Sequence, residues 1–122
     1  IAGPLTMLNL LRLRDVADYT EIPELAPETP ISGHEADDRY IAHTLPHLQA
    51  SGGELLYLGD GGDYFIGPEG EGWDVVMLVR QASVDDFIAF ATNEQYLAGA
   101  GHRTAAVRDS RILPLTDRMV DS

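Results

Sequence analysis

The amino-acid sequence predicts a single α+β domain whose strands and helices follow the order β-α-β-β-α-β. Apolar runs of strand length lie at residues 5–13, 54–59 and 73–80. One helical pattern follows the first run and another follows the third, each opened by a serine with an acidic residue three positions later. The connections are mostly short, and 122 residues suit one domain. We therefore expect one domain over residues 1–122.

The first strand is predicted at residues 5–13, LTMLNLLRL. This run is apolar on both faces, so both faces of the sheet should be covered. Asn9 interrupts the run, and a buried amide without a partner costs about 1 to 3 kcal/mol. Asn9 is thus either hydrogen-bonded within the frame or lines a cavity that binds a polar group.

Residues 15–31, DVADYTEIPELAPETPI, contain three prolines and no sustained period, which predicts a long loop. Loops of this length are uncommon in compact domains and often close over a site. We expect this loop to act as a lid.

The first helix is predicted to begin at the capping box of Ser32 and Glu35 and to end at the glycines of 52–53. Pro46 should kink its last turns. Its apolar stripe recurs at helical spacing and consists of Ile41, Leu45 and Leu48.

His43 and His47 are spaced four residues apart on this helix, as metal ligands often are. On a helical wheel they fall with Tyr40 opposite the apolar stripe, so we expect them to face solvent or another subunit. We predict no metal site.

The middle of the chain predicts a hairpin. Residues 54–59 (ELLYLG) form the second strand and residues 73–80 (WDVVMLVR) the third, again apolar on both faces. The glycine-rich stretch 60–72 joins them, with a strand extension and a turn at Gly67-Pro68.

The second helix is predicted to open at Ser83 and Asp86 and to carry an apolar stripe at i, i+3, i+4 and i+7, formed by Val84, Phe87, Ile88 and Ala91. A shorter helical piece follows over residues 93–100. The basic segment 102–108 (HRTAAVR) then leads into a last strand at 110–115.

This order is the ferredoxin-like arrangement, a four-stranded antiparallel sheet with helices on one face only. The other face of the sheet is left bare. Because the first and third strands are apolar on both sides, that face must be buried, most simply by an identical sheet across a two-fold axis. We expect a homodimer.

Composition excludes several function classes. The net charge is -12, from 20 acidic and 8 basic residues, which disfavours binding of nucleic acid. The chain contains no cysteine, which excludes thiolate nucleophiles and sulfur-ligated metals. It also contains no lysine, since all eight basic residues are arginine, and this excludes Schiff bases and a pyridoxal-phosphate anchor. No apolar window reaches the length of a membrane span, and no signal core begins the chain. We expect a soluble, cytoplasmic protein without a membrane partner.

Three stretches carry a family resemblance: GPLTMLNLLRLR (3–14), IGPEGEGWDVVMLVRQASVDDFIAF (66–90) and YLAGAGHRTAAVRDSRILPL (96–115). The chain resembles the domain-of-unknown-function family numbered 1330, in the dimeric α/β-barrel superfamily, over essentially its whole length. The resemblance implies two ferredoxin-like protomers whose sheets close into a barrel, with a pocket inside each. It implies no single reaction, because that superfamily includes cofactor-free monooxygenases, cyclases, lactone isomerases and haem-degrading enzymes.

In this topology the segments 14–31, 60–72 and 102–108 converge at one end of the sheet, where we place the mouth of a pocket. Asn9 shares its strand face with Met7, Leu11 and Leu13. If that face looks into the barrel, the Asn9 amide projects into the cavity and can orient a carbonyl or enolate oxygen.

His102 is the natural general acid or base near this mouth, since its unperturbed pKa is near 6.5. Its alternative role is that of a solvated loop histidine. Arg103 and Arg80 can hold a carboxylate, or they can pair with surplus acids of the chain.

Trp73, the only tryptophan, and Tyr57 can form stacking walls for a ligand or can simply pack in the core. His34, near the start of the first helix and below the predicted lid, is a further candidate ligand-binding residue.

We therefore expect a small-molecule-binding protein, either a cofactor-free enzyme of cyclase, isomerase or monooxygenase type or a non-catalytic binder or sensor. In the enzyme, Asn9 would polarise a carbonyl-bearing metabolite and His102 would carry the proton. A third hypothesis is haem binding or degradation, which the pair of Asn9 and His102 fits and the position of Trp73 does not. We expect no cofactor.

Overall fold

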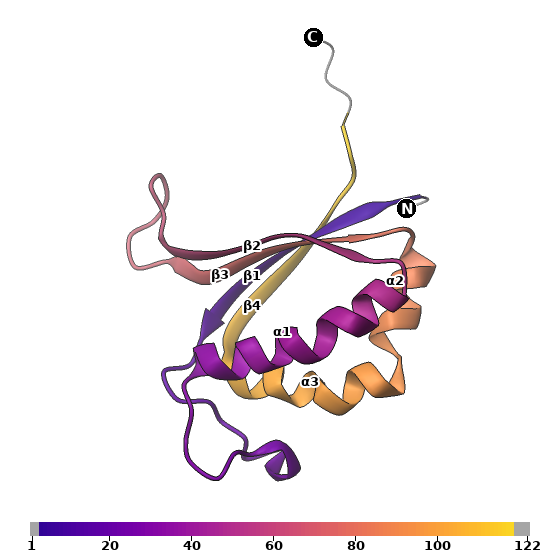
Figure 1. Ribbon diagram of the computed structural model, residues 1–122. Coiled ribbons are helices and arrows are strands. Elements are labelled where there is room, and N and C mark those ends of the chain that lie inside the picture. Colours follow the sequence, from indigo (N-terminus) through magenta and orange to yellow (C-terminus); the bar gives the residue numbers. More distant parts are fainter. Residues whose placement is uncertain (1–2, 119–122) are drawn as a thin grey trace.

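The computed structural model describes residues 3–118 and has the predicted βαββαβ order. One antiparallel sheet carries its strands in the order β2-β3-β1-β4, and the helices lie on one face of it (Figure 1). The ferredoxin-like α+β fold is confirmed. Its elements are β1 (Leu5–Leu13), the short 3-10 helix η1 (Pro23–Leu25), α1 (Gly33–Ala50), β2 (Glu54–Asp63), β3 (Gly72–Gln81), α2 (Val84–Ala91), α3 (Glu94–Ala106) and β4 (Val107–Leu115).

Both predicted capping residues begin their helices. The Ser32 hydroxyl accepts a hydrogen bond from the Glu35 backbone N–H at 3.0 Å, and the Ser83 hydroxyl accepts one from the Asp86 N–H at 3.0 Å. Each bond satisfies a backbone donor that the first helical turn leaves free. Pro46 lies inside α1, which continues past it to Ala50.

The segment 102–108, predicted to be irregular, is largely helical. The helix α3 runs on to Ala106, and β4 follows directly from Val107. The reason lies in packing, because Ala105 and Ala106 are fully buried in a small core with Tyr19 and Ala36. Burial of these alanines favours continued helix where the local basic composition had suggested a loop.

The strand register decides which way Asn9 points. In β1, Asn9 lies opposite Met77 of β3 and Ile112 of β4. Residues paired in this way project to the same face of a sheet. That face carries the buried Leu11, Val75 and Met77, against which Ile41 of α1 packs. Asn9 therefore faces the helices.

Within residues 3–118, no helix covers the opposite side of the sheet (Figure 1). It carries an apolar surface, which we call the outer sheet face, formed by Leu8, Leu10, Tyr57, Val76, Leu78 and Leu113. Tyr57 is 54% and Leu113 is 53% exposed. The prediction that this face would be bare of helices is confirmed.

The loop before α1 packs against the ends of two helices. The backbone N–H groups of Arg14 and Asp18 donate to the carbonyls of Ala106 at 2.8 Å and Ala105 at 2.9 Å. Tyr19 is only 8% exposed and packs on these alanines. The loop thus lies beside the start of α1 and the end of α3 (Figure 1).

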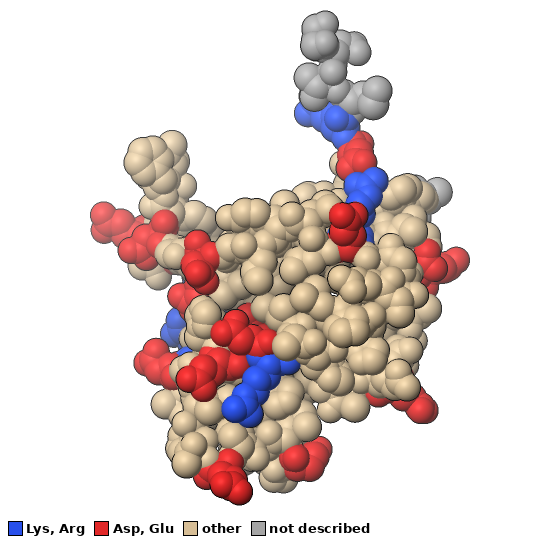
Figure 2. All heavy atoms as spheres, in the orientation of Figure 1, with Lys and Arg blue, Asp and Glu red and all other residues tan. Residues whose placement is uncertain are grey.

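The β2–β3 hairpin extends beyond the rest of the sheet and curls away from the helices (Figure 1). Its strands pair as far as Asp63 and Gly72, which confirms the predicted strand extension within 60–72. Phe65 and Ile66 at its tip are 102% and 89% exposed. Acidic side chains gather over this hairpin, the start of α1 and the loop below it (Figure 2).

Candidate functional site

A cavity of about 220 Å³ lies between the sheet and the helices of the protomer. Its walls come from β1, β3, α1, α2 and α3 and are mostly apolar, with Met7, Met77, Phe87 and Phe90 among them. Pockets for drug-sized ligands usually enclose roughly 300 to 1,000 Å³. This cavity is smaller, so it suits a correspondingly small molecule. Ile112 of the edge strand β4 is 50% exposed and marks the rim.

Polar atoms without partners converge on this cavity. Among the described residues, no hydrogen bond is made by the buried Thr44 Oγ1, by either amide atom of Gln81 or by Nη2 of Arg103, and all three side chains line the cavity. Each unmet buried polar atom costs about 1 to 3 kcal/mol.

Two tyrosines add a hydroxyl pair to the cavity wall. The hydroxyl groups of Tyr40 on α1 and Tyr96 on α3 lie 2.9 Å apart and are hydrogen-bonded. Burial raises the pKa of Tyr40 above its ordinary value, so this phenol stays neutral. A neutral pair of hydroxyls keeps one hydrogen free to donate to a ligand.

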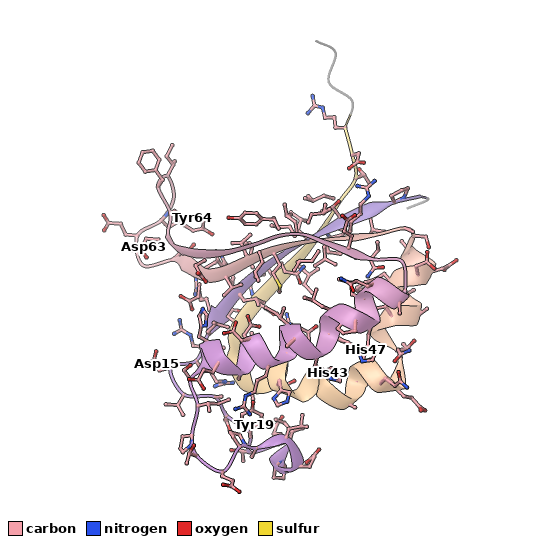
Figure 3. All side chains as sticks on the ribbon, viewed as in Figure 1. Asp15, Tyr19, His43, His47, Asp63 and Tyr64 are labelled. Atoms are coloured by element: carbon pink, nitrogen blue, oxygen red, sulfur yellow. The ribbon has the colours of Figure 1, made fainter. Side chains whose placement is uncertain are left out.

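Tyr40 and His43 were expected on the outer face of the first helix, and this expectation is wrong. The Nε2 atom of His43 lies 2.8 Å from the Gln95 carbonyl oxygen, and its ring fills the space beside Gly99 of α3. Figure 3 shows His43 and His47 on the side of α1 that faces α3. Because α1 packs on both the sheet and α3, its buried arc is wider than one apolar stripe indicates.

Asn9 lines the cavity, and its Nδ2 also donates to the Met7 carbonyl oxygen at 3.2 Å. The amide is thus hydrogen-bonded within the frame while one of its N–H groups stays available. We expected Asn9 to face the inside of a barrel formed by two sheets, and this expectation is wrong. The β1 face that carries Met7, Asn9 and Leu11 packs on the helices of the same protomer.

His102 does not line the cavity. Its Nδ1 lies 2.8 Å from the Tyr19 hydroxyl, and the two rings meet edge to face. Burial lowers the pKa of His102, so the imidazole is neutral at neutral pH. The structure does not bring His102 together with Asn9. The proton-carrier role of His102 and the haem hypothesis both required the two residues in one site, so neither is supported.

Trp73 and Tyr57 also lie outside the cavity. Trp73 stands at the hairpin end of β3, where Nε1 donates to the Tyr64 hydroxyl at 2.7 Å. The guanidinium carbons of Arg12 and Arg111 lie 4.7 and 5.6 Å from its ring centre. Tyr57 belongs to the outer sheet face.

Arg80 pairs with an acid, as one of its two predicted roles allows, through a 3.2 Å contact with Asp117. His34 lies 3.5 Å from both Asp38 and Asp60, and the hydrogen bond with Asp60 is the main cause of its raised pKa.

Of the three segments expected to form the mouth, 14–31 and 60–72 meet near His34, whereas 102–108 contributes no residue there. They form a shallow hollow that shares none of the cavity's lining residues, and its lining consists of Leu13, Arg14, Asp15, Ser32, His34, Asp60 and Asp74. The loop 15–31 contributes nothing to the cavity wall. Arg103 is thus the one other predicted site residue, beside Asn9, that lines the cavity.

The functional candidates that the sequence did not reveal are Tyr40, Thr44, Gln81 and Tyr96. A signal for Gln81 was present, because it shares strand parity with Val75, Met77 and Val79 of β3. The reasoning applied to Asn9 would have identified it. No comparable signal distinguished the other residues.

Within residues 3–118, no group of three or more His, Cys, Asp or Glu side chains is placed to hold a metal ion. None of the helices in this range has the length and apolar character that crossing a bilayer requires.

The fold and the cavity together define a class, that of ferredoxin-like α+β proteins with an internal cavity between sheet and helices. No protein-family model and no curated protein matches the chain. Among solved structures, RPA0582, a protein of unknown function from Rhodopseudomonas palustris, is similar with a TM-score of 0.85 and 32% identity, covering 98% of this chain and 86% of that one. The chain belongs to the same family as RPA0582.

More distant structures share the fold alone. A dimeric ferredoxin-like protein of unknown function from Bacteroides fragilis matches at a TM-score of 0.56 and 12% identity, over 92% of this chain and 94% of that one. SnoaB, a cofactor-independent oxygenase from Streptomyces nogalater, matches at a TM-score of 0.60 and 13% identity, over 98% of this chain and 97% of that one.

Proposed function

We propose that the internal cavity binds a small, mostly apolar metabolite that carries a carbonyl oxygen, and that the protein is a cofactor-free enzyme acting on it. The observation that carries this proposal is that three residues lining an apolar cavity, Thr44, Gln81 and Arg103, hold buried polar atoms without hydrogen-bond partners among the described residues. If this region served only to pack the core, aliphatic side chains would fill the space and no unpaired polar atoms would be buried beside it. The proposal includes membership of the domain-of-unknown-function family numbered 1330.

The lining residues suit stabilisation of negative charge on oxygen. The free N–H of Asn9 and the guanidinium of Arg103 are donors that would strengthen their bonds as a carbonyl becomes an enolate. The chain contains no cysteine and no lysine, so covalent catalysis through a thiolate or an imine is excluded. A non-catalytic binder would use the same cavity and remains the alternative function.

Occupation of the cavity is tested by narrowing it. Ala91 on α2 lines the cavity, whereas Ala89 on the same helix is exposed. In a thermal-shift screen of small ketones, quinones and enolisable esters, Ala91→Leu should abolish the stabilisation given by any hit, while Ala89→Leu should preserve it. Equal binding by both variants would place the ligand elsewhere and contradict the proposal.

Catalysis is separated from binding with Asn9→Ala. For an enzyme, turnover of a hit, followed by product analysis and oxygen uptake, should fall by roughly 10²-fold or more on loss of an oxyanion donor. Binding of the hit should change much less. A hit that binds through the cavity and is never converted by the wild-type protein supports the binder instead.

We further propose that a second copy of the chain covers the outer sheet face. This face is apolar, and the fold relative from Bacteroides fragilis is dimeric. The hairpin projects from the same sheet, away from the helices (Figure 1), and we expect its exposed Phe65 and Ile66 to contact that second copy.

A further inference from the structure

The charge inside the cavity points to a class of ligand. Arg103 contributes to the cavity wall, and its Nη2 is buried without a hydrogen-bond partner among the described residues. In a chain of net charge -12 an arginine finds acids easily at the surface. A guanidinium buried beside an apolar cavity with no acid in contact is costly, and an anionic oxygen bound beside it would offset that cost.

The buried acid that interacts with this arginine makes no contact with it. Asp37, one turn before Tyr40 on α1, is 2% exposed, and its Oδ1 has no hydrogen-bond partner within the described chain. No carboxylate among residues 3–118 lies within 4.0 Å of a nitrogen of Arg103. Asp37 does interact with Arg103 at longer range, since the guanidinium partly offsets the rise in the Asp37 pKa. The cavity therefore carries one positive group with incomplete compensation.

The tyrosine pair provides a second donor in the same wall. Tyr40 is close enough to Arg103 for the guanidinium charge to act on its hydroxyl. Because one hydroxyl of the Tyr40–Tyr96 pair donates to the other, one O–H remains for a ligand. A carboxylate, with two oxygens and several lone pairs, can accept from both the guanidinium and this hydroxyl.

We propose that the ligand is a small organic monoanion, whose carboxylate binds Arg103 and the Tyr40–Tyr96 pair while its apolar body lies against Met77, Phe87 and Phe90. The inference rests on the proposed function, because it takes the cavity as the ligand site. A single charge is specified because Arg103 is the one cationic side chain among the described residues that line the cavity, and the buried Asp37 interacts with it at longer range. The apolar remainder of the wall excludes a second anionic group on the ligand body.

Matched pairs of compounds test this proposal. Phenylacetate and phenylacetamide share one apolar body, as do hexanoate and hexanamide, and each pair differs only in charge. By titration calorimetry at pH 7.5, the wild-type protein should bind each acid at least tenfold more tightly than its amide. Arg103→Gln should remove this preference by weakening the acid at least tenfold and the amide less than threefold. Arg108→Gln, which removes an exposed arginine of β4, should leave the preference intact.

The outcomes separate this inference from the proposed function. If acid and amide bind wild type equally and Ala91→Leu abolishes both, the cavity is the site and the monoanion inference is overturned. If Ala91→Leu leaves the binding of all four compounds unchanged, both fail. Failure of all four to bind at millimolar concentration also overturns the inference. The ratio of the acid and amide affinities is measured on the wild-type protein alone. It therefore tests the monoanion inference even if Arg103→Gln does not fold.

Discussion

At the scale of single residues, the buried acid Asp37 is the clearest source of pH dependence. Burial, reinforced by the neighbouring Asp38, raises its pKa from 3.8 to about 6, although Arg103 and His34 act in the opposite direction. Because its pKa is higher in the folded state, Asp37 contributes stability that is fully present below pH 3.8 and is lost as the pH rises through about 6.

Asp37→Asn should therefore stabilise the protein at pH 7.5 by about 1 to 3 kcal/mol, as a shift of about two pKa units implies. The gain should disappear near pH 4, where the wild-type carboxyl is already protonated. Urea denaturation at both pH values measures it, with Glu28→Gln in the exposed loop as a control of unchanged stability. Destabilisation at pH 7.5 would show that attraction to Arg103 outweighs the cost of burial.

Single residues also show where sequence reasoning ends. Asn9 could be identified because an amide stands out in an apolar strand, and Arg103 because the topology brings its segment near a site. Thr44 and Tyr96 have no such contrast with their neighbours. His102 was assigned to a loop, and its contact with Tyr19 depends on the continuation of α3, which only the packed alanines at 105 and 106 determine.

At the scale of elements, the contact between α1 and α3 sets the shape of the site. His43 of α1 occupies the space that a side chain at Gly99 would need. This close approach brings Tyr40 and Tyr96 into hydrogen-bonding distance at 2.9 Å. The strands and helix caps were predictable from local sequence pattern. The pairing of α1 with α3 was not, because it depends on Gly99, whose missing side chain matters only once His43 of α1 lies beside it.

Gly99→Ala should destabilise the protein by about 1 to 3 kcal/mol, because the added methyl collides with the His43 ring. In a His43→Ala background the same change should be neutral or stabilising by up to about 1 kcal/mol, since alanine is the better helix former. A double-mutant cycle in urea measures the coupling. Equal effects in both backgrounds would rule out the proposed contact.

At the scale of the whole molecule, the outer sheet face indicates assembly. Its apolar side chains come from all four strands, and their pattern was readable from the sequence as strands apolar on both sides. What the sequence could not indicate was that the cavity lies on the other side of the sheet, since a one-residue change of register exchanges the two faces.

Leu78→Asp should convert a dimer into a monomer, because it places a charge at the centre of the outer sheet face. We expect at least a hundredfold weaker association in sedimentation velocity. Val16→Asp changes an apolar side chain that is 60% exposed in the loop, and it should leave assembly unaltered. A Leu78→Asp protein that still sediments as a dimer would place the interface elsewhere.

The unpaired atoms of Thr44 and Gln81 have a consequence for evolution and engineering. A sequence optimised on this backbone for stability alone would replace both residues with aliphatic ones, remove the desolvation cost and gain in melting temperature. Under the proposed function, these residues represent a trade-off between stability and activity, in which a bound ligand offsets the cost of burying their polar atoms. Stabilising substitutions in this wall should thus be selected against wherever the natural ligand is needed.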